Sequence, residues 1–292
     1  MSGLKLSVLL TALPLLVLAR STSPPIHIVG NLYYVGDTDL AAYLVVTPKG
    51  DILINSGFEY SVTEIRDRVK TLGFRFTDIK ILLATHAHSD HVAAMATIKR
   101  LTGARMMAIE QEAELLETGG KTDYLFGSAG WFPPVKVDHT FKDGDKIELG
   151  GSTLTAYLTP GHTKGSTSYS MNIVENGREY HVLIANLPNL NEGTALIKNP
   201  QYPGIAADYA RTFEVLRQLP CDIYLTSHAG QFGLTAKYQP GKPYSPNSFV
   251  DPYGLPRILN RLEQEFQAEL DEQEQEEQAI EDRKHFKDVR PN

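Results

Sequence analysis

Short apolar runs separated by turn sequences dominate the chain up to residue 185. In residues 31–57, the runs NLYYVG, AAYLVVT and ILINSG surround the turn tetrapeptide PKGD, which predicts paired strands. The run IKILLAT, directly before His86, is mostly apolar, as in a strand that is buried on both faces. Two further strand pairs are predicted in residues 142–185, one around a Gly-Gly turn and one around ENGR. Hairpins in both regions favour mixed sheets.

Helical spacing of apolar residues follows several of these strands. SVTE at residues 61–64 matches a capping box, and apolar residues recur after it at helical spacing until Gly73. The same spacing predicts a helix from Val92 to a stop at Gly103, one around QEAELLE, and one over DYARTFEVLRQLP. Strands therefore come in two groups, each followed by helices, and CDIYLTSH is predicted to be the last strand. This order predicts an α/β (α+β) fold in which two mixed β-sheets pack together with helices outside.

The N-terminus has the composition of a targeting segment. Residues 1–19 contain Lys5, the apolar run LSVLLTALPLLVLA and a final VLA, which together predict a cleaved signal peptide. A membrane anchor is the alternative, but the run is shorter than the roughly 20 residues of a membrane span. Cleavage predicts a periplasmic or secreted protein with no stable membrane association.

The C-terminus differs from the predicted domain, which covers residues 24–270. After Pro256 a predicted helix loses its apolar stripe, and residues 271–292 are an acidic, glutamine-rich tail that is expected to be solvated or disordered. An acidic interaction tail is the alternative. The net charge of −7 argues against a nucleic-acid partner. The single cysteine, Cys221, excludes an intrachain disulfide, and a monomer is expected.

Six candidate metal ligands each follow an apolar or turn-linked strand segment. His86 and His88 are two residues apart in ATHAHSDH, so in an extended segment they project to the same side. Asp90 comes next, where the chain must turn into a helix. Loops at strand ends are where sites are usually built. The full set is His86, His88, Asp90, His91, His162 and His228.

Neutral imidazoles and a carboxylate are the ligands that zinc accepts. Six such groups can hold two ions with three protein ligands each, which leaves positions open for water, as in a catalytic site. Two ions roughly 3.5–4 Å apart can lower the pKa of a shared water to near 7, so the pattern predicts a hydrolase with water as the nucleophile. The other histidines lack this context and are expected to be surface or hydrogen-bonded groups: His27, His139, His181 and His285.

The sequence THAHSDH resembles the T-H-x-H-x-D-H signature of the metallo-β-lactamase superfamily, and the resemblance runs from about residue 29 to residue 265. Further segments resemble subclass B3 of that family: INSGFE, GGKTDY, FPPVKVD, LTPGHTKGST, YPGIAADYARTF and LPCDIYL. The resemblance implies a four-layer αβ/βα sandwich with the metals at the edge between two sheets. It also implies two Zn²⁺ ions, the first held by His86, His88 and His162 and the second by Asp90, His91 and His228.

Two differences from other members favour subclass B3. Glyoxalase II-like and lactonase-like members bridge their metals with an aspartate after the strand that follows the third histidine, whereas the segment here, VLIANLPNLNEG, has none. Other β-lactamase subclasses use a cysteine ligand in that region. Cys221 instead starts the last predicted core strand, where burial as a small apolar residue explains it better.

The resemblance implies zinc-dependent hydrolysis of β-lactam antibiotics (penicillins, cephalosporins and carbapenems), with Asp90 as the catalytic residue that holds the second ion and orients the hydroxide. Leu187 stands where B3 enzymes often have a hydroxyl near the second zinc. Asn189 and Lys164 are candidates for binding the substrate carboxylate. One alternative is another hydrolase of this fold, acting on a lactone, thioester or phosphate ester. A non-catalytic zinc-binding protein is a third possibility.

Overall fold

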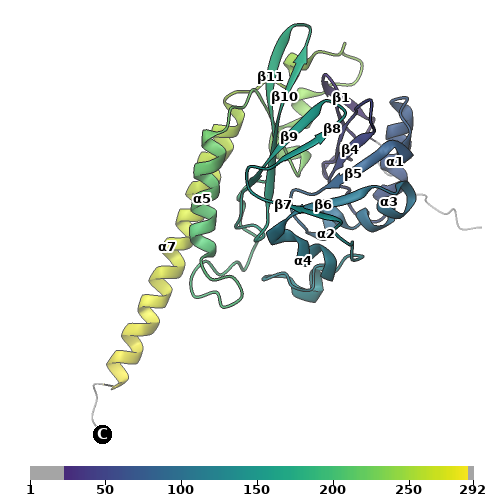
Figure 1. Cartoon of the computed structure of the whole chain (residues 1–292). Helices are drawn as coiled ribbons and strands as arrows, with labels where there is room; N and C mark the ends of the chain where they lie inside the picture. Colours follow the sequence, from purple (N-terminus) through teal and green to yellow (C-terminus); the bar gives the residue numbers. More distant parts are fainter. Residues whose placement is uncertain (1–22, 289–292) are drawn as a thin grey trace, which may run out of the picture.

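Two β-sheets, covered on their outer faces by helices, make up the body of the computed structural model, which describes residues 23–288 (Figure 1). The signal peptide predicted over residues 1–19 lies outside the described residues. The first sheet has seven strands that follow one another in sequence order. They are β1 (Ile26–Val29), β2 (Leu32–Tyr34), β3 (Tyr43–Val45), β4 (Asp51–Ile54), β5 (Ile79–Leu83), β6 (Arg105–Ile109) and β7 (His139–Phe141).

The second sheet has five strands in the order β12-β11-β10-β9-β8. They are β8 (Lys146–Leu149), β9 (Ser152–Leu158), β10 (Thr167–Glu175), β11 (Arg178–Ala185) and β12 (Ile223–Thr226). Both sheets are mixed: β1 to β4 are antiparallel and β4 to β7 parallel, while β8 to β11 are antiparallel and β12 is parallel to β11. The predicted sandwich of two mixed sheets is confirmed.

The helices lie on the two outer sides of this sandwich (Figure 1). Those beside the first sheet are α1 (Ser61–Thr71), α2 (Ser89–Val92), α3 (Met95–Thr102) and α4 (Glu110–Thr118). The others are α5 (Ile205–Gln218), which lies between β11 and β12 in the chain, and α6 (Leu234–Lys237) and α7 (Gly254–Asp288), which come after β12. No helix within residues 23–288 combines the length and the apolar character that crossing a bilayer requires.

The core has two layers because the central strands are apolar on both faces. Along β4, Ile52 and Ile54 pack into the cluster between the sheets, whereas Leu53 packs into the cluster beneath the helices of the first sheet. Along β5, Leu82 belongs to the second cluster and its neighbour Leu83 to the first. This is the alternation expected of a pleated strand with no solvent-facing side. It anchors β5 firmly where the chain runs into His86.

One local prediction is wrong. Ser61 is the first residue of α1 and makes no side-chain cap; the preceding Tyr60 holds the cap position, so SVTE is not a capping box. Residues 271–288 continue α7, and most side chains of residues 271–285 are exposed, so this part of the predicted solvated or disordered tail is a solvent-exposed helix. Glutamate, glutamine and alanine are strong helix formers, and pairs four residues apart, such as Gln278 with Asp282, add support. Gly103, with φ of 71°, ends α3 as predicted.

Candidate metal centre

The six candidate ligands meet in one cavity of about 400 Å³ at the edge of the two sheets. His86 follows β5, and His88 is the cap residue of α2, whose first turn carries Asp90 and His91. The other two ligands come from the second sheet: His162 follows β9 and His228 follows β12. The chain therefore assembles the cavity from three strand ends that are far apart in sequence, as the sequence pattern predicts.

The donor atoms form two overlapping groups. One nitrogen each of His86, His88 and His162 lie within 4.8 Å of one another, and the same limit holds for His86, Asp90 and His91. His228 joins the second group, since its Nε2 is 3.6 Å from Asp90 Oδ2. These separations suit ligands that share metal ions rather than ligands that bond to each other.

Outer partners fix the orientation of three rings. His88 Nε2 donates to Asp123 Oδ2 at 3.3 Å, and His162 Nδ1 donates to the carbonyl oxygen of Asn189 at 2.9 Å. His228 Nδ1 lies 3.3 Å from a carboxylate oxygen of Asp39. In each ring one nitrogen is thus occupied, which leaves the other to bind within the cavity. Metal-bound histidines usually have such an outer partner.

Buried nitrogen atoms without partners support a bound cation. His86 Nε2 and both ring nitrogens of His91 are buried and make no hydrogen bond within the described residues. His91 Nε2 lies 3.0 Å from Asp90 Oδ2, yet the two atoms do not have hydrogen-bonding geometry. A buried polar group without a partner is costly. A cation between the imidazole and the carboxylate would satisfy both groups, so the donors fit a metal ion.

Burial also keeps these groups in the protonation states that metals bind. Burial, and then the neighbouring histidines, lower the pKa of His86 well below its ordinary value. Burial, and next His88, lower the pKa of His162 to about 3, and burial also lowers that of His91. Burial alone would raise the pKa of Asp90, but the rings of His91, His88 and His228 lower it below the ordinary carboxyl range. Neutral imidazoles with one carboxylate are a donor set suited to zinc.

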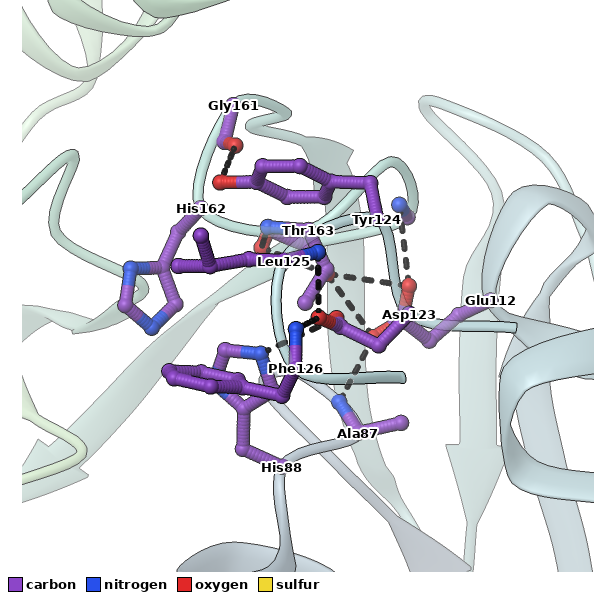
Figure 2. Close-up of polar contacts among 12 residues, drawn as sticks. Ala87, His88, Glu112, Asp123, Tyr124, Leu125, Phe126, Gly161, His162 and Thr163 are labelled. Atoms are coloured by element: carbon purple, nitrogen blue, oxygen red, sulfur yellow. Dashed lines mark hydrogen bonds and ion pairs between the residues drawn. The ribbon is translucent and has the colours of Figure 1, made fainter. Parts of the chain in front are cut away.

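A buried carboxylate that sequence reasoning missed links the two ligand loops. Glu112, in α4, is 3% exposed. One of its oxygens accepts from the Ala87 N–H at 2.6 Å and the other from the Gly165 N–H at 2.9 Å, while the Thr163 hydroxyl is within 3.0 Å of both (Figure 2). Ala87 lies between two candidate ligands, and Thr163 follows a third. Glu112 therefore ties the loop after β5 to the loop after β9.

The sequence did hold a weak signal for Glu112, because it shares the buried face of α4 with Leu115 and Leu116 at helical spacing. A charged residue on an apolar stripe needs a buried partner. Burial raises the pKa of Glu112 to about 7, and hydrogen bonds from Thr163, Ala87 and Gly165 oppose that rise.

Asp123 is the second residue that sequence reasoning missed. One carboxylate oxygen accepts from the backbone N–H groups of Leu125 and Phe126, and the other accepts from His88 (Figure 2). In the sequence, the segment GGKTDY resembles subclass B3, but that resemblance predicted no role for Asp123. The Phe126 ring also packs on the His88 ring, with centroids 5.2 Å apart. The loop around Asp123 therefore holds His88 by a hydrogen bond and by a ring contact.

Asp123→Asn is expected to lower zinc affinity by about 10- to 100-fold, the usual effect of losing an outer partner of a metal ligand. If the two backbone hydrogen bonds are kept, the NH2 group of the introduced amide turns toward His88 Nε2, which favours the tautomer whose proton sits on the nitrogen that faces the cavity. Competition with a chromophoric chelator measures the affinity. Asp67→Asn, at an exposed surface position, is the control, and equal affinities in the two variants would contradict this role of Asp123.

The two candidate substrate residues lie in different places. Asn189 lines the cavity beside Asn186 and Leu187, and its side chain makes no hydrogen bond with another described residue. Lys164 is exposed and is not among the described residues that line the cavity; its Nζ lies 5.5 Å from the centre of the Tyr202 ring. Cys221 packs against the core, as expected. The geometry therefore supports Asn189 more than Lys164.

Comparisons with known proteins agree with the fold and the motif. A family model described as "Metallo-beta-lactamase superfamily" matches residues 35–174. The native metallo-β-lactamase from Legionella gormanii is 44% identical, with a TM-score of 0.84 over 87% of this chain and 98% of that one. The class B3 di-zinc metallo-β-lactamase from an Alaskan soil metagenome is 43% identical, with a TM-score of 0.82 over 87% and 98% of the two chains. The metallo-β-lactamase from Elizabethkingia meningoseptica is 41% identical, with a TM-score of 0.84 over 92% and 100%.

Curated relatives of a different name match a shorter stretch. The hydroxyacylglutathione hydrolase from Fuscovulum blasticum is 32% identical over 97 residues, which is 33% of this chain and 30% of that enzyme. The chain thus matches less than a third of that relative's length, whereas its match to the solved structures covers nearly their whole chains.

Proposed function

This chain belongs to the metallo-β-lactamase superfamily, and on that premise we propose that it is a zinc-dependent hydrolase of β-lactam antibiotics, of the B3 kind. The observation that carries the proposal is the complete set of six donors in one cavity, within a chain that matches three β-lactamase structures over nearly their full length. Penicillins, cephalosporins and carbapenems are the proposed substrates.

The residues of the cavity wall favour a β-lactam substrate over the lactone and thioester substrates of other family members. Among the described residues that line the cavity, only Asp90 and Asp123 carry carboxylates, and Asp123 is held by His88 and by backbone N–H groups. The segment after β11 supplies Leu187 and asparagine amides instead of the aspartate expected of lactonase-like and glyoxalase II-like members. The short match to hydroxyacylglutathione hydrolases is the observation that favours a thioester substrate as the second candidate.

We propose that two zinc ions bind in the cavity. His86, His88 and His162 would hold one, and Asp90, His91 and His228 the other. Bound zinc supplies a Lewis acid for a carbonyl group and lowers the pKa of water. Asp90, which stays ionised, can accept a hydrogen bond from a group at the attack position, and the Asn189 amide can bind the substrate carboxylate. The partly exposed rings of Phe58 and Phe126 give apolar contact at the mouth.

This catalysis needs no serine nucleophile, because water is the attacking group. A cavity of about 400 Å³ is suited to a small molecule. We also propose, from the N-terminal residues 1–19 and the net charge of −7, that the mature protein acts in the periplasm or outside the cell, as a monomer without a nucleic-acid partner.

The zinc-loaded protein is expected to open the ring of a penicillin, a cephalosporin or a carbapenem, which is followed by the loss of ultraviolet absorbance. A chelator should abolish turnover, and added zinc should restore it. An acyl-lactone and a glutathione thioester form the comparison panel. Turnover of the lactone or thioester without turnover of any β-lactam would overturn the proposed substrate; zinc binding without any turnover would indicate a non-catalytic protein.

A further inference from the structure

The segment between β11 and α5, residues 186–204, forms one wall of the metal cavity and is called here the 186–204 loop. Asn186, Leu187, Asn189 and Asn191 from its first part line the cavity. The segment has no helix or strand of its own. A loop of this length inside a compact domain is usually functional or disordered. Contacts with other elements must therefore hold it in place.

The first part of the 186–204 loop is fixed to a candidate ligand. The carbonyl oxygen of Asn189 accepts from His162 Nδ1 at 2.9 Å and from the Tyr209 hydroxyl at 3.3 Å. The position of this carbonyl sets the orientation of the His162 ring, and the same residue offers its amide side chain to the cavity. A shift of the loop therefore moves a ligand partner and a substrate contact together.

The second part of the loop is held by α7. Gln273 accepts from the Leu196 N–H at 2.7 Å and, more weakly, from the Ile197 N–H at 3.4 Å, and it donates to the carbonyl oxygen of Thr194 at 2.8 Å. In Figure 1 the loop before the N-terminal end of α5 lies beside the long α7, which continues past it. One side chain thus satisfies backbone groups on both sides of Leu196, which is itself buried.

Lys198 adds a second attachment. It forms ion pairs with Glu277 and with Glu281, the latter at 3.1 Å. Its φ of 50° is unusual for a residue other than glycine, and such a conformation persists where surrounding contacts hold it. Because exposed ion pairs contribute little to stability, Gln273 is expected to be the stronger of the two attachments.

The residues that face the loop continue the buried stripe of α7. Leu262, Phe266 and Leu270 pack toward the core, and Gln273, Glu277 and Glu281 follow at spacings of three or four residues. The apolar stripe therefore ends because the helix face then meets polar backbone and Lys198 instead of the core. The polar and acidic side chains at this end of α7 therefore complement the backbone groups and the lysine of the loop.

We propose that the end of α7 braces the 186–204 loop over the metal site, with Gln273 as a positioning residue that acts through the loop on Asn189 and His162. The substrate part of this inference rests on the proposed function. Without the brace, the loop spends part of its time away from the cavity. The apparent substrate affinity is then the intrinsic affinity multiplied by the fraction of molecules whose loop is in place.

The test compares Gln273→Ala with Gln278→Ala in the full zinc-loaded chain. Gln278 lies in the same helix and is exposed; the structure gives its side chain one bond, to Asp282. Both changes replace glutamine with a stronger helix former, so helix formation is matched. For Gln273→Ala we expect faster amide hydrogen exchange at residues 192–200 and a KM for a β-lactam that rises about 3- to 10-fold, because the loop loses hydrogen bonds that hold it. The kcat should stay within about twofold, and Gln278→Ala should match the wild type.

Two outcomes would overturn the proposed brace. In the first, Gln273→Ala leaves both the amide hydrogen exchange at residues 192–200 and the KM unchanged. In the second, Gln273→Ala lowers kcat, zinc content and melting temperature as strongly as it raises KM, which indicates a general structural defect. If the wild type hydrolyses no β-lactam, the proposed function fails, but hydrogen exchange at residues 192–200 still decides whether Gln273 holds the loop.

Discussion

Asp90→Asn is expected to lower kcat/KM for a β-lactam by about 10³-fold or more, because metal-ion catalysis contributes several kcal/mol and each 1.36 kcal/mol is a factor of ten. Asp90 is the only carboxylate among the six candidate ligands, with Oδ2 3.0 Å from His91 Nε2 and 3.6 Å from His228 Nε2. An amide carries no charge, and its NH2 group cannot bind a cation. Of the two zinc ions that we propose, the one assigned to Asp90 should therefore be lost first.

Zinc per chain, measured by elemental analysis after dialysis, separates this effect from a failure to fold. The expected content for Asp90→Asn is about half that of the wild type, with an unchanged circular dichroism spectrum. Asp67→Asn, whose side chain is 68% exposed, should retain full zinc and full activity. Full zinc content in Asp90→Asn together with near-normal turnover would show that Asp90 is neither a ligand nor a catalytic residue.

The fold and the candidate ligands were predictable because their signals are local. An apolar run that is buried on both faces predicts a central strand, and β5 delivers the chain to His86 as expected. The other ligands also follow strand ends, and strand ends of packed sheets meet at an edge. Patterns of this kind can be recognised in the sequence because they depend on residues that are neighbours in the chain.

The supporting residues were not predictable in the same way, because their partners come from distant segments. Glu112 contacts the backbone of Ala87 and Gly165, and no sequence spacing reports such a contact. Gln273 meets the 186–204 loop across more than seventy residues, as its separation of 77 from Leu196 shows. The sequence predicted the helix after Pro256 and the loss of its apolar stripe, but it could not show that Gln273, on the polar part of that helix, binds backbone groups of a distant loop.

Glu112→Ala is expected to destabilise the zinc-free protein by about 2–4 kcal/mol at pH 5, because buried donors lose their acceptor. The Ala87 and Gly165 N–H groups and the Thr163 hydroxyl all donate to this one carboxyl group. With zinc present, looser ligand loops should lower metal affinity about 10- to 100-fold, as for other outer partners of metal ligands. Calorimetry and chelator competition measure the two effects, and Glu114→Ala, exposed in the same helix, is the control.

The pH dependence of this destabilisation has a definite sign. Burial raises the pKa of Glu112 from 4.5 to about 7 in the folded protein. Between pH 4.5 and 7 the native state therefore binds more protons than the unfolded state, so the contribution of Glu112 to stability is full below pH 4.5 and falls as the pH rises toward 7. Glu112→Ala lacks this slope. The difference in unfolding free energy between wild type and variant should shrink, on the order of 2 kcal/mol, from about pH 5 to about pH 8 in the presence of a chelator. A difference that instead grows with pH would show that Glu112 is ionised throughout, and that the hydrogen bonds to its carboxylate outweigh the cost of burying the charge.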